Sequence, residues 1–153
     1  MNLNDLLIFI EIEISDIDLT VDYILQLYET IGTTKPDVFQ KAAITQLVAQ
    51  FYNGIENILK IMCKYKNHTI PYGSHSHIEL FNLFIEKNPL GNPILFTNII
   101  CDDFIGIRKF RHFAIHGYAF KIKWEYIKPS LERLKNSYII FKSQLFQFVE
   151  LEK

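Results

Sequence analysis

Residues 36–64, PDVFQKAAITQLVAQFYNGIENILKIMCK, decide the fold of this chain. Apolar side chains recur in this stretch at steps of four residues and finally three: Phe39, Ala43, Leu47, Phe51, Ile55, Leu59 and Met62. Residues at such spacing share one face of an α-helix, and Pro36 suits the start of a helix. The stretch predicts one long core helix that ends near Lys64.

Toward the N-terminus, residues 21–31 also place apolar side chains at steps of three and four, and Gly32 is suited to end that helix. Residues 8–14, IFIEIEI, alternate apolar with polar side chains as a strand does. No second strand is predicted, and an unpaired strand leaves its backbone groups unsatisfied. A first helix that extends back through residues 8–14 is therefore predicted.

Three further helices are predicted toward the C-terminus. Ser76 and Glu79 form a candidate capping box for a helix that ends near Lys87, after which Pro89, Gly91 and Pro93 break the chain. The next two helices are then defined by caps and breakers. One has Thr97 as its cap, an apolar stripe of Ile99, Phe104, Ile107 and Ile115, and ends at His116 before Gly117; the other covers residues 125–151 and carries Pro129 near its first turns.

The predicted fold is all-α, an up-and-down bundle of about five helices in a single domain over residues 1–153. The hydrophobic fraction of 49% in 153 residues suits one sizeable core. With six Gly, five Pro and no Ser/Gly-rich or Pro-rich tract, the chain offers no candidate linker to a second domain. No stretch approaches the roughly 18 apolar residues of a membrane span. Cys63 and Cys101 lie in apolar, helix-like surroundings without a secretory segment, which predicts free thiols and a cytoplasmic protein.

The net charge of −1 is unevenly distributed along the chain. Residues 1–34 carry acids but no Lys or Arg, which is typical of a solvated helix face. Residues 104–124 carry no acid and form a basic patch that attracts anions. The patch contains Arg108, Lys109, Arg111, Lys121 and Lys123, together with His112 and His116.

Arg111, His116 and Tyr118 are the candidates for chemistry. Arg111 and His116 are five residues apart, hence about 140° apart around a helix and roughly 7.5 Å along it, so both can line one cleft. Gly117 lets the chain leave the helix and expose the hydroxyl of Tyr118. The plainer interpretation is that Arg111 and His116 complement the negative end of the helix dipole and that Tyr118 is a partly buried aromatic.

The segment from Arg111 to Tyr118 resembles the motif of HEPN-domain toxins of the HepT ribonuclease type: an arginine, four residues, a histidine, one residue and a tyrosine. Residues 51–59 and 124–129 also resemble HepT-like segments in the same order, so the similarity covers roughly residues 36–135. His112 departs from the pattern, because many HEPN motifs have Asn or another small polar residue after the arginine. The resemblance implies an all-helical bundle, in agreement with the periodicity.

The resemblance also implies metal-independent cleavage of RNA without a cofactor, in which a ribose 2′-hydroxyl attacks the adjacent phosphate. His116 is then expected to transfer protons, and Arg111 to bind the phosphate through two N–H groups and stabilise its growing charge. Arg108, Lys109, His112, Lys121 and Lys123 are expected to extend the RNA-binding surface, although solubility alone explains surface lysines equally well.

Two kinds of partner follow from the same resemblance. A homodimer would join two motif helices and so supply both an acid and a base in one groove. A nucleotidyltransferase antitoxin of the MNT type would inactivate the toxin by adenylylating Tyr118, since the added bulk and negative charge repel RNA phosphates.

The sequence allows three other interpretations. A zinc site can be drawn from His112 and His116 with His75 and His77, but no His-Glu-x-x-His arrangement supports it. A non-catalytic helical module would bind a nucleotide, an RNA or a protein in the dimer groove without cutting. An aromatic ligand pocket around Tyr23, Tyr28 and Tyr138 is a third reading, although such residues at helical spacing usually belong to the core.

Overall fold

The computed structural model describes residues 1–86 and 92–153. The helices are α1 (Leu3–Ile31), α2 (Val38–Tyr65), α3 (Ser76–Asn82), α4 (Cys101–His116), the 3₁₀ turn η1 (Ala119–Lys121) and α5 (Trp124–Glu152). Within the described residues the only β-type pairing is an isolated bridge between Ile85 and Phe96. The all-α prediction is confirmed.

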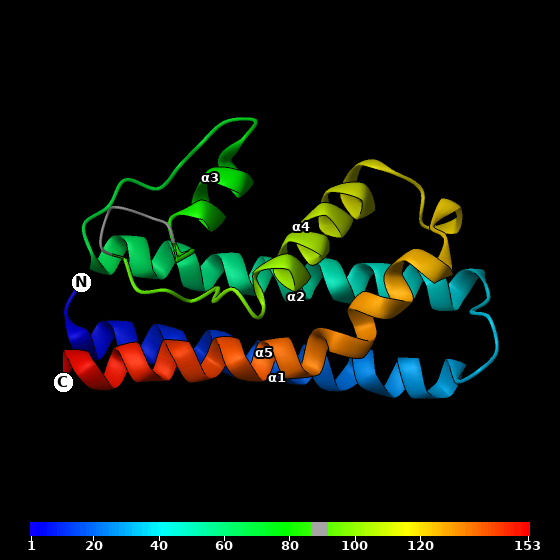
Figure 1. The fold of residues 1–153 in the computed structure, drawn as a ribbon, viewed down its shortest axis with the longest axis horizontal. Helices are drawn as coiled ribbons and strands as arrows, with labels where there is room; N and C mark the ends of the chain where they lie inside the picture. The colour runs from blue at the N-terminus through cyan, green and yellow to red at the C-terminus, as the bar shows by residue number, and fades with distance from the viewer. Residues whose placement is uncertain (87–91) are drawn as a thin grey trace.

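The three long helices run along the length of the molecule (Figure 1). Helix α2 returns beside α1, α4 crosses α2 obliquely, and α5 runs back so that the two chain termini lie at the same end. Helix α3 packs on α2 as a short side element. Along the chain α1, α2, α4 and α5 therefore alternate in direction, as an up-and-down bundle requires. None of the helices among the described residues is long and apolar enough to cross a membrane.

Helix α1 contains residues 8–14, so the prediction of a helix rather than a strand in this segment is confirmed. Its first turn is closed by a capping box between Asn2 and Asp5. Of the alternating isoleucines, Ile10 and Ile14 are buried whereas Ile8 and Ile12 are exposed. The buried face continues at steps of three and four residues through Ile17 to Val21. The apolar–polar alternation is thus confined to residues 8–14, whereas the helical spacing extends over more residues and predicts the structure correctly.

Helix α2 buries a different stripe near its start from the one that the sequence predicts. Phe51, Ile55, Leu59 and Met62 are buried, but Phe39 is 81% exposed. Ala43 is exposed as well, and the buried residues of these turns are Ile44 and Val48. The reason is that four residues turn a helix by about 400°, so a strict four-residue ladder drifts about 40° per step. Three steps before Phe51 the ladder faces solvent.

Several predicted caps and ends are wrong. Helix α2 is capped by Asp37 and Gln40 in a capping box, whereas α3 has His75 as its N-cap and no capping box at Ser76. Helix α3 ends at Asn82, and the predicted end near Lys87 and the breakers Pro89 and Gly91 lie outside the described residues. Helix α4 begins at Cys101 without a side-chain cap. Among the described residues the Oγ1 atom of Thr97 has no hydrogen-bond partner, and the Thr97 carbonyl accepts from the backbone N–H groups of Ile100 and Cys101. Ile99 and Ile115, predicted as core, are exposed.

A cluster of aromatic rings holds α4 against α2 and α5. The ring centroids of Phe96 and Phe104 lie 5.0 Å apart, and both rings contact Phe141 at 5.6 Å. Phe51 of α2 stacks on Phe104 at 6.1 Å, and Phe81 of α3 stacks on Phe96 at 4.2 Å. Aromatic pairs of this geometry add about 0.5–1.5 kcal/mol each beyond the burial of their surface. The cluster therefore positions α3 and α4, which carry the candidate site.

Both cysteines are free, as predicted. Burial raises the pKa of the Cys63 thiol to about 11. A thiol with such a pKa is almost fully protonated at neutral pH and is a poor nucleophile. Cys63 is therefore a core residue and not a candidate for chemistry.

Candidate functional site

The last two turns of α4 carry Arg111 and His116, but the two side chains do not meet at one point. The Arg111 side chain is 15% exposed and turns toward α2 and α3. His116, the last residue of α4, is exposed, as is His112. The difference follows from the helix geometry, because two residues five positions apart face directions about 140° apart.

Arg111 lies at the centre of a polar network that links three helices. Its Nε donates a hydrogen bond to Asn53 Oδ1 of α2 at 2.7 Å, and the same nitrogen lies 3.8 Å from Glu56 Oε1. Its Nη1 lies 3.2 Å from His77 Nε2 of α3. His77 in turn contacts the other carboxylate oxygen of Glu56 through Nδ1 at 2.6 Å. We call Asn53, Glu56, His77 and Arg111 the arginine network.

The arginine network also determines the proton position on His77. A guanidinium only donates, so the contact with Nε2 is a hydrogen bond only when Nε2 carries no proton. The proton then lies on Nδ1 and faces Glu56. A neutral imidazole oriented by a carboxylate is the arrangement that serves proton transfer in many active sites. In this structure its free nitrogen is occupied by Arg111.

Glu56 is the residue of the network that most needs its partners. Its side chain is only 5% exposed, and a buried carboxylate is costly unless it is paired and hydrogen-bonded. The buried hydroxyl of Tyr52 has no hydrogen-bond partner among the described residues. Burial, and secondly the charge of Glu56, raise the pKa of Tyr52. Arg111 therefore compensates the carboxylate in addition to any role toward a ligand.

His112 and His116 form a pair on the exposed side of α4. Their ring centroids are 4.6 Å apart, as expected for residues four positions apart on a helix. Neither ring has a carboxylate partner among the residues that the structure describes. Two exposed imidazoles therefore lie side by side at the end of α4.

Gly117 and Tyr118 lead the chain away from α4. Gly117 has a φ of −114°, so it does not need the left-handed region. A Cβ at this position would lie 2.9 Å from the carbonyl oxygen of Phe113, which the backbone NH of Gly117 approaches to 2.7 Å. Tyr118 is 64% exposed, stacks on Phe120 with centroids 5.5 Å apart, and has the Lys121 ammonium 5.5 Å from its ring centroid. Tyr118 as a residue is therefore exposed beside the end of α4.

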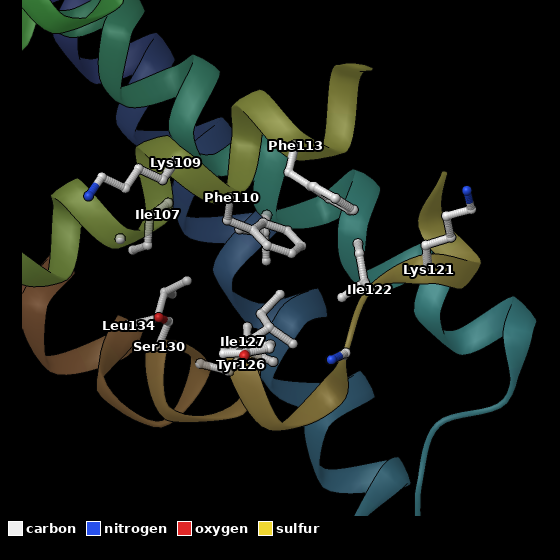
Figure 2. Close-up of a pocket in the computed structure, with 14 residues that line it drawn as sticks. Ile107, Lys109, Phe110, Phe113, Lys121, Ile122, Tyr126, Ile127, Ser130 and Leu134 are labelled. Carbon is white, nitrogen blue, oxygen red and sulfur yellow. The ribbon is translucent and has the colours of Figure 1, made fainter. Parts of the chain in front are cut away.

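Apart from Arg111, the Arg and Lys residues of the patch divide into two groups. The Arg108 guanidinium lies over the Phe81 ring at 5.0 Å, so it packs on α3. Lys109, Lys121 and Lys123 instead line a cavity of about 420 Å³ between α4 and α5. Figure 2 shows Lys109 and Lys121 on opposite sides of this cavity, with the rings of Phe110 and Phe113 between them.

Asn53 and Glu56 were not among the predicted site residues, and His77 was named only as one histidine of the zinc interpretation. A signal was available for Glu56, because a charged residue stands between Ile55 and Leu59 on the most apolar helix of the chain. No comparable signal marked His77, which comes from a loop-flanked short helix. In the parts of the chain that the structure describes, no three His, Cys, Asp or Glu residues come together in a way that could hold a metal ion.

A protein-family model described as HepT-like protein matches residues 43–151, which is more than half of the chain. The chain belongs to the HepT-like family. The match begins in α2 and ends in α5, so it contains the arginine network and the whole segment from Arg111 to Tyr118 of this HepT-like protein. No curated protein and no solved structure matched the chain.

Proposed function

We propose that this HepT-like protein is a metal-independent endoribonuclease toxin that acts as a homodimer in the cytoplasm. The main support is the family match over residues 43–151, which contains an arginine, a histidine and a tyrosine in the toxin spacing at an accessible helix end. The lysines beside this end, Lys109, Lys121 and Lys123, suit a polyanionic substrate. Cleavage would release a 5′-hydroxyl end and leave a cyclic phosphate on the other fragment.

The proposed roles follow from the chemistry of the side chains. The ribose 2′-oxygen attacks the adjacent phosphorus, its proton passes to an imidazole, and the leaving 5′-oxygen receives a proton from a second imidazole. His116 supplies one of these groups, and the partner's His116 supplies the other in a two-fold dimer. Arg111 binds the phosphate and stabilises the negative charge of the transition state.

Tyr118 is proposed as the regulated residue. Its exposed phenol oxygen would attack the α-phosphorus of a nucleoside triphosphate on an MNT-type nucleotidyltransferase antitoxin, losing its proton while pyrophosphate leaves. The adenylyl group would then place a negative charge beside Lys121 and close to His116, where it repels RNA phosphates. Such a modification would switch the nuclease off.

One observation favours a second candidate, a non-catalytic module that binds RNA, a nucleotide or a protein. The Arg111 guanidinium is held by Asn53, Glu56 and His77 and is mostly buried. In that reading Arg111 stabilises the bundle, and the exposed histidines and lysines only bind. The two functions differ in one respect, because binding survives the loss of an imidazole and proton transfer does not.

The test is an RNA cleavage assay with purified protein in EDTA, which compares the wild type with His116→Ala. His68→Ala is the matched control, because His68 is an imidazole outside the motif. We expect the wild type and the control to cut total RNA and His116→Ala to lose at least about 100-fold in rate. Equal cleavage by His116→Ala contradicts the proposed role of His116, and no cleavage by folded wild-type protein leaves the binding module as the function.

A further inference from the structure

The cavity between α4 and α5 is an apolar groove, and its charged lining residues within the described part of the chain are lysines. Its walls include Phe110 and Phe113 of α4 and Tyr126 and Ile127 of α5, and Ile122 closes one end (Figure 2). Tyr126 is 78% exposed and Phe113 is 41% exposed, so the aromatic edges are accessible from solvent. A volume of about 420 Å³ is in the range of ligand-binding clefts. We call this cavity the lysine groove.

The charge of the lysine groove is uncompensated. No acidic residue lines it, and Lys109, Lys121 and Lys123 form no ion pair with a carboxylate in residues 1–86 and 92–153. Lys121 and Lys123 lie instead over the rings of Tyr118 and Tyr126, at 5.5 and 5.8 Å from the centroids. A second copy of this chain that docked its own groove here by two-fold symmetry would bring lysines together. The charge therefore favours a negatively charged occupant.

The positions of the lysines point to an occupant with more than one negative charge. Lys109 lies at one side of the groove and Lys121 at the other, with the aromatic walls between them (Figure 2). A fatty acid or another anion with a single head group would need only one of these lysines. A nucleic acid strand carries a phosphate on each nucleotide and a flat base between successive phosphates, which matches cations at both sides of an aromatic surface.

We infer that the lysine groove binds unpaired bases of single-stranded RNA. The base faces lie against the rings of Phe110, Phe113 and Tyr126, and the phosphates pass Lys109 and Lys121. Paired bases in an A-form duplex are stacked inside the helix and cannot enter such a groove. This inference rests on the proposed function in taking RNA as the ligand, and it adds that the RNA is unpaired beside the motif end of α4.

Gly106 of α4 offers a way to fill the groove without touching the motif. Gly106 lines the cavity, and a Cβ at this position would meet only the Ser130 Oγ at 3.7 Å, an ordinary contact. Gly106→Leu places a branched side chain in the groove. Gly106→Ala is the matched control, because it makes the same change from glycine on the helix and leaves most of the space open. Both substitutions favour the helical backbone.

The experiment measures binding by fluorescence anisotropy with a labelled 2′-O-methyl oligonucleotide of about ten nucleotides. This probe has no free 2′-hydroxyl and is not cut. We expect the wild type and Gly106→Ala to bind the single strand at least about tenfold more tightly than its duplex or an abasic strand of the same length, and Gly106→Leu to lose that preference. Circular dichroism of the variants establishes that each is folded.

Three results overturn the inference: equal affinity of the wild type for single strand and duplex, equal affinity of Gly106→Leu and Gly106→Ala for the single strand, or binding of decanoate but not of RNA. Cleavage of natural RNA is scored separately. If the groove variants behave as expected and natural RNA stays intact, the inference that the lysine groove binds single-stranded RNA is supported and the nuclease proposal fails. If natural RNA is cut equally by Gly106→Leu and Gly106→Ala, the inference about the lysine groove is contradicted and the nuclease proposal is supported.

Discussion

At the scale of single residues, the Arg111 guanidinium has a structural role in the arginine network and a proposed role in binding phosphate. Glu56 is 5% exposed and needs a cation beside it, and Asn53 Oδ1 and His77 Nε2 accept hydrogen bonds from Arg111. A phosphate would compete for the same N–H groups. Loss of activity on replacing Arg111 would therefore not distinguish a role in catalysis from a loss of the folded state, unless stability is measured as well.

We predict that Arg111→Ala lowers the free energy of unfolding by about 3 kcal/mol, because the buried Glu56 carboxylate loses its cation and keeps only the His77 imidazole as a partner. Glu56→Gln removes that charge, so the double variant Arg111→Ala with Glu56→Gln should recover part of the loss. The measurement is urea unfolding of both single variants and the double variant.

The coupling energy decides the outcome of this cycle. Additive effects of the two substitutions would show that Arg111 does not compensate Glu56 in the folded protein. Arg111→Lys keeps the positive charge and is the variant to use for cleavage assays, since a lysine does not present the two parallel N–H donors of arginine.

At the scale of the elements, the packing of α1 against α2 depends on one glycine. A Cβ added to Gly54 would lie 2.5 Å from Cγ1 and 3.0 Å from Cδ1 of Ile17, which is buried. The two helices thus approach closely where Gly54 lies. Ile17 has little freedom to move away, because its branched Cβ restricts its side-chain rotamers in a helix.

We predict opposite effects of glycine-to-alanine substitution at two helical positions. Gly54→Ala should destabilise the protein by about 1–3 kcal/mol through overpacking against Ile17. Gly106→Ala should stabilise it by about 0.5–1 kcal/mol, because the added methyl group meets only Ser130 at 3.7 Å. Thermal and urea unfolding of both variants checks the two signs, and a stable Gly54→Ala protein would show that α1 can shift on α2 at little cost.

At the scale of the whole molecule, the charge is divided between two regions. The acidic side chains of residues 1–34 belong to α1, and the basic patch lies on α4, η1 and the segment up to the start of α5. Several large apolar side chains are exposed in that basic region, among them Ile115, Tyr118 and Phe120. Exposed apolar side chains gathered beside functional residues are typical of a contact surface.

We predict that the protein is a dimer of twice its 18.1 kDa chain and that the exposed end of α4 lies in the contact. Ile115→Asp should shift the protein to a monomer and lower RNA cleavage, because Ile115 lies next to His116 and is 49% exposed. Ile12→Asp is the control, since Ile12 is 55% exposed on α1. Sedimentation velocity measures both. A wild type that sediments as a monomer, or an Ile115→Asp dimer, would contradict the prediction.

The sequence by itself determined the fold class, the long helices and the segment from Arg111 to Tyr118. Apolar spacing is a local property that repeats over many residues, so it identified α1, α2 and α5 even where residues 8–14 alternate. The family motif is likewise local. Its spacing alone predicts that Arg111 and His116 point in different directions from the same helix. The initial turns of α2 and the caps of α3 and α4 were wrong, because a four-residue ladder drifts and because a cap depends on the local backbone.

Only the tertiary structure decided what surrounds the motif. The arginine network joins Asn53 and Glu56 of α2, His77 of α3 and Arg111 of α4, and the lysine groove forms where α4 crosses α5. These contacts connect residues up to 58 positions apart, such as Arg111 and Asn53. Periodicity reports which face of a helix is buried but not which helix covers it. The aromatic packing of Phe51, Phe96, Phe104 and Phe141 determines which helices cover α4. It orients α4 so that Arg111 points inward and His116 lies at the surface.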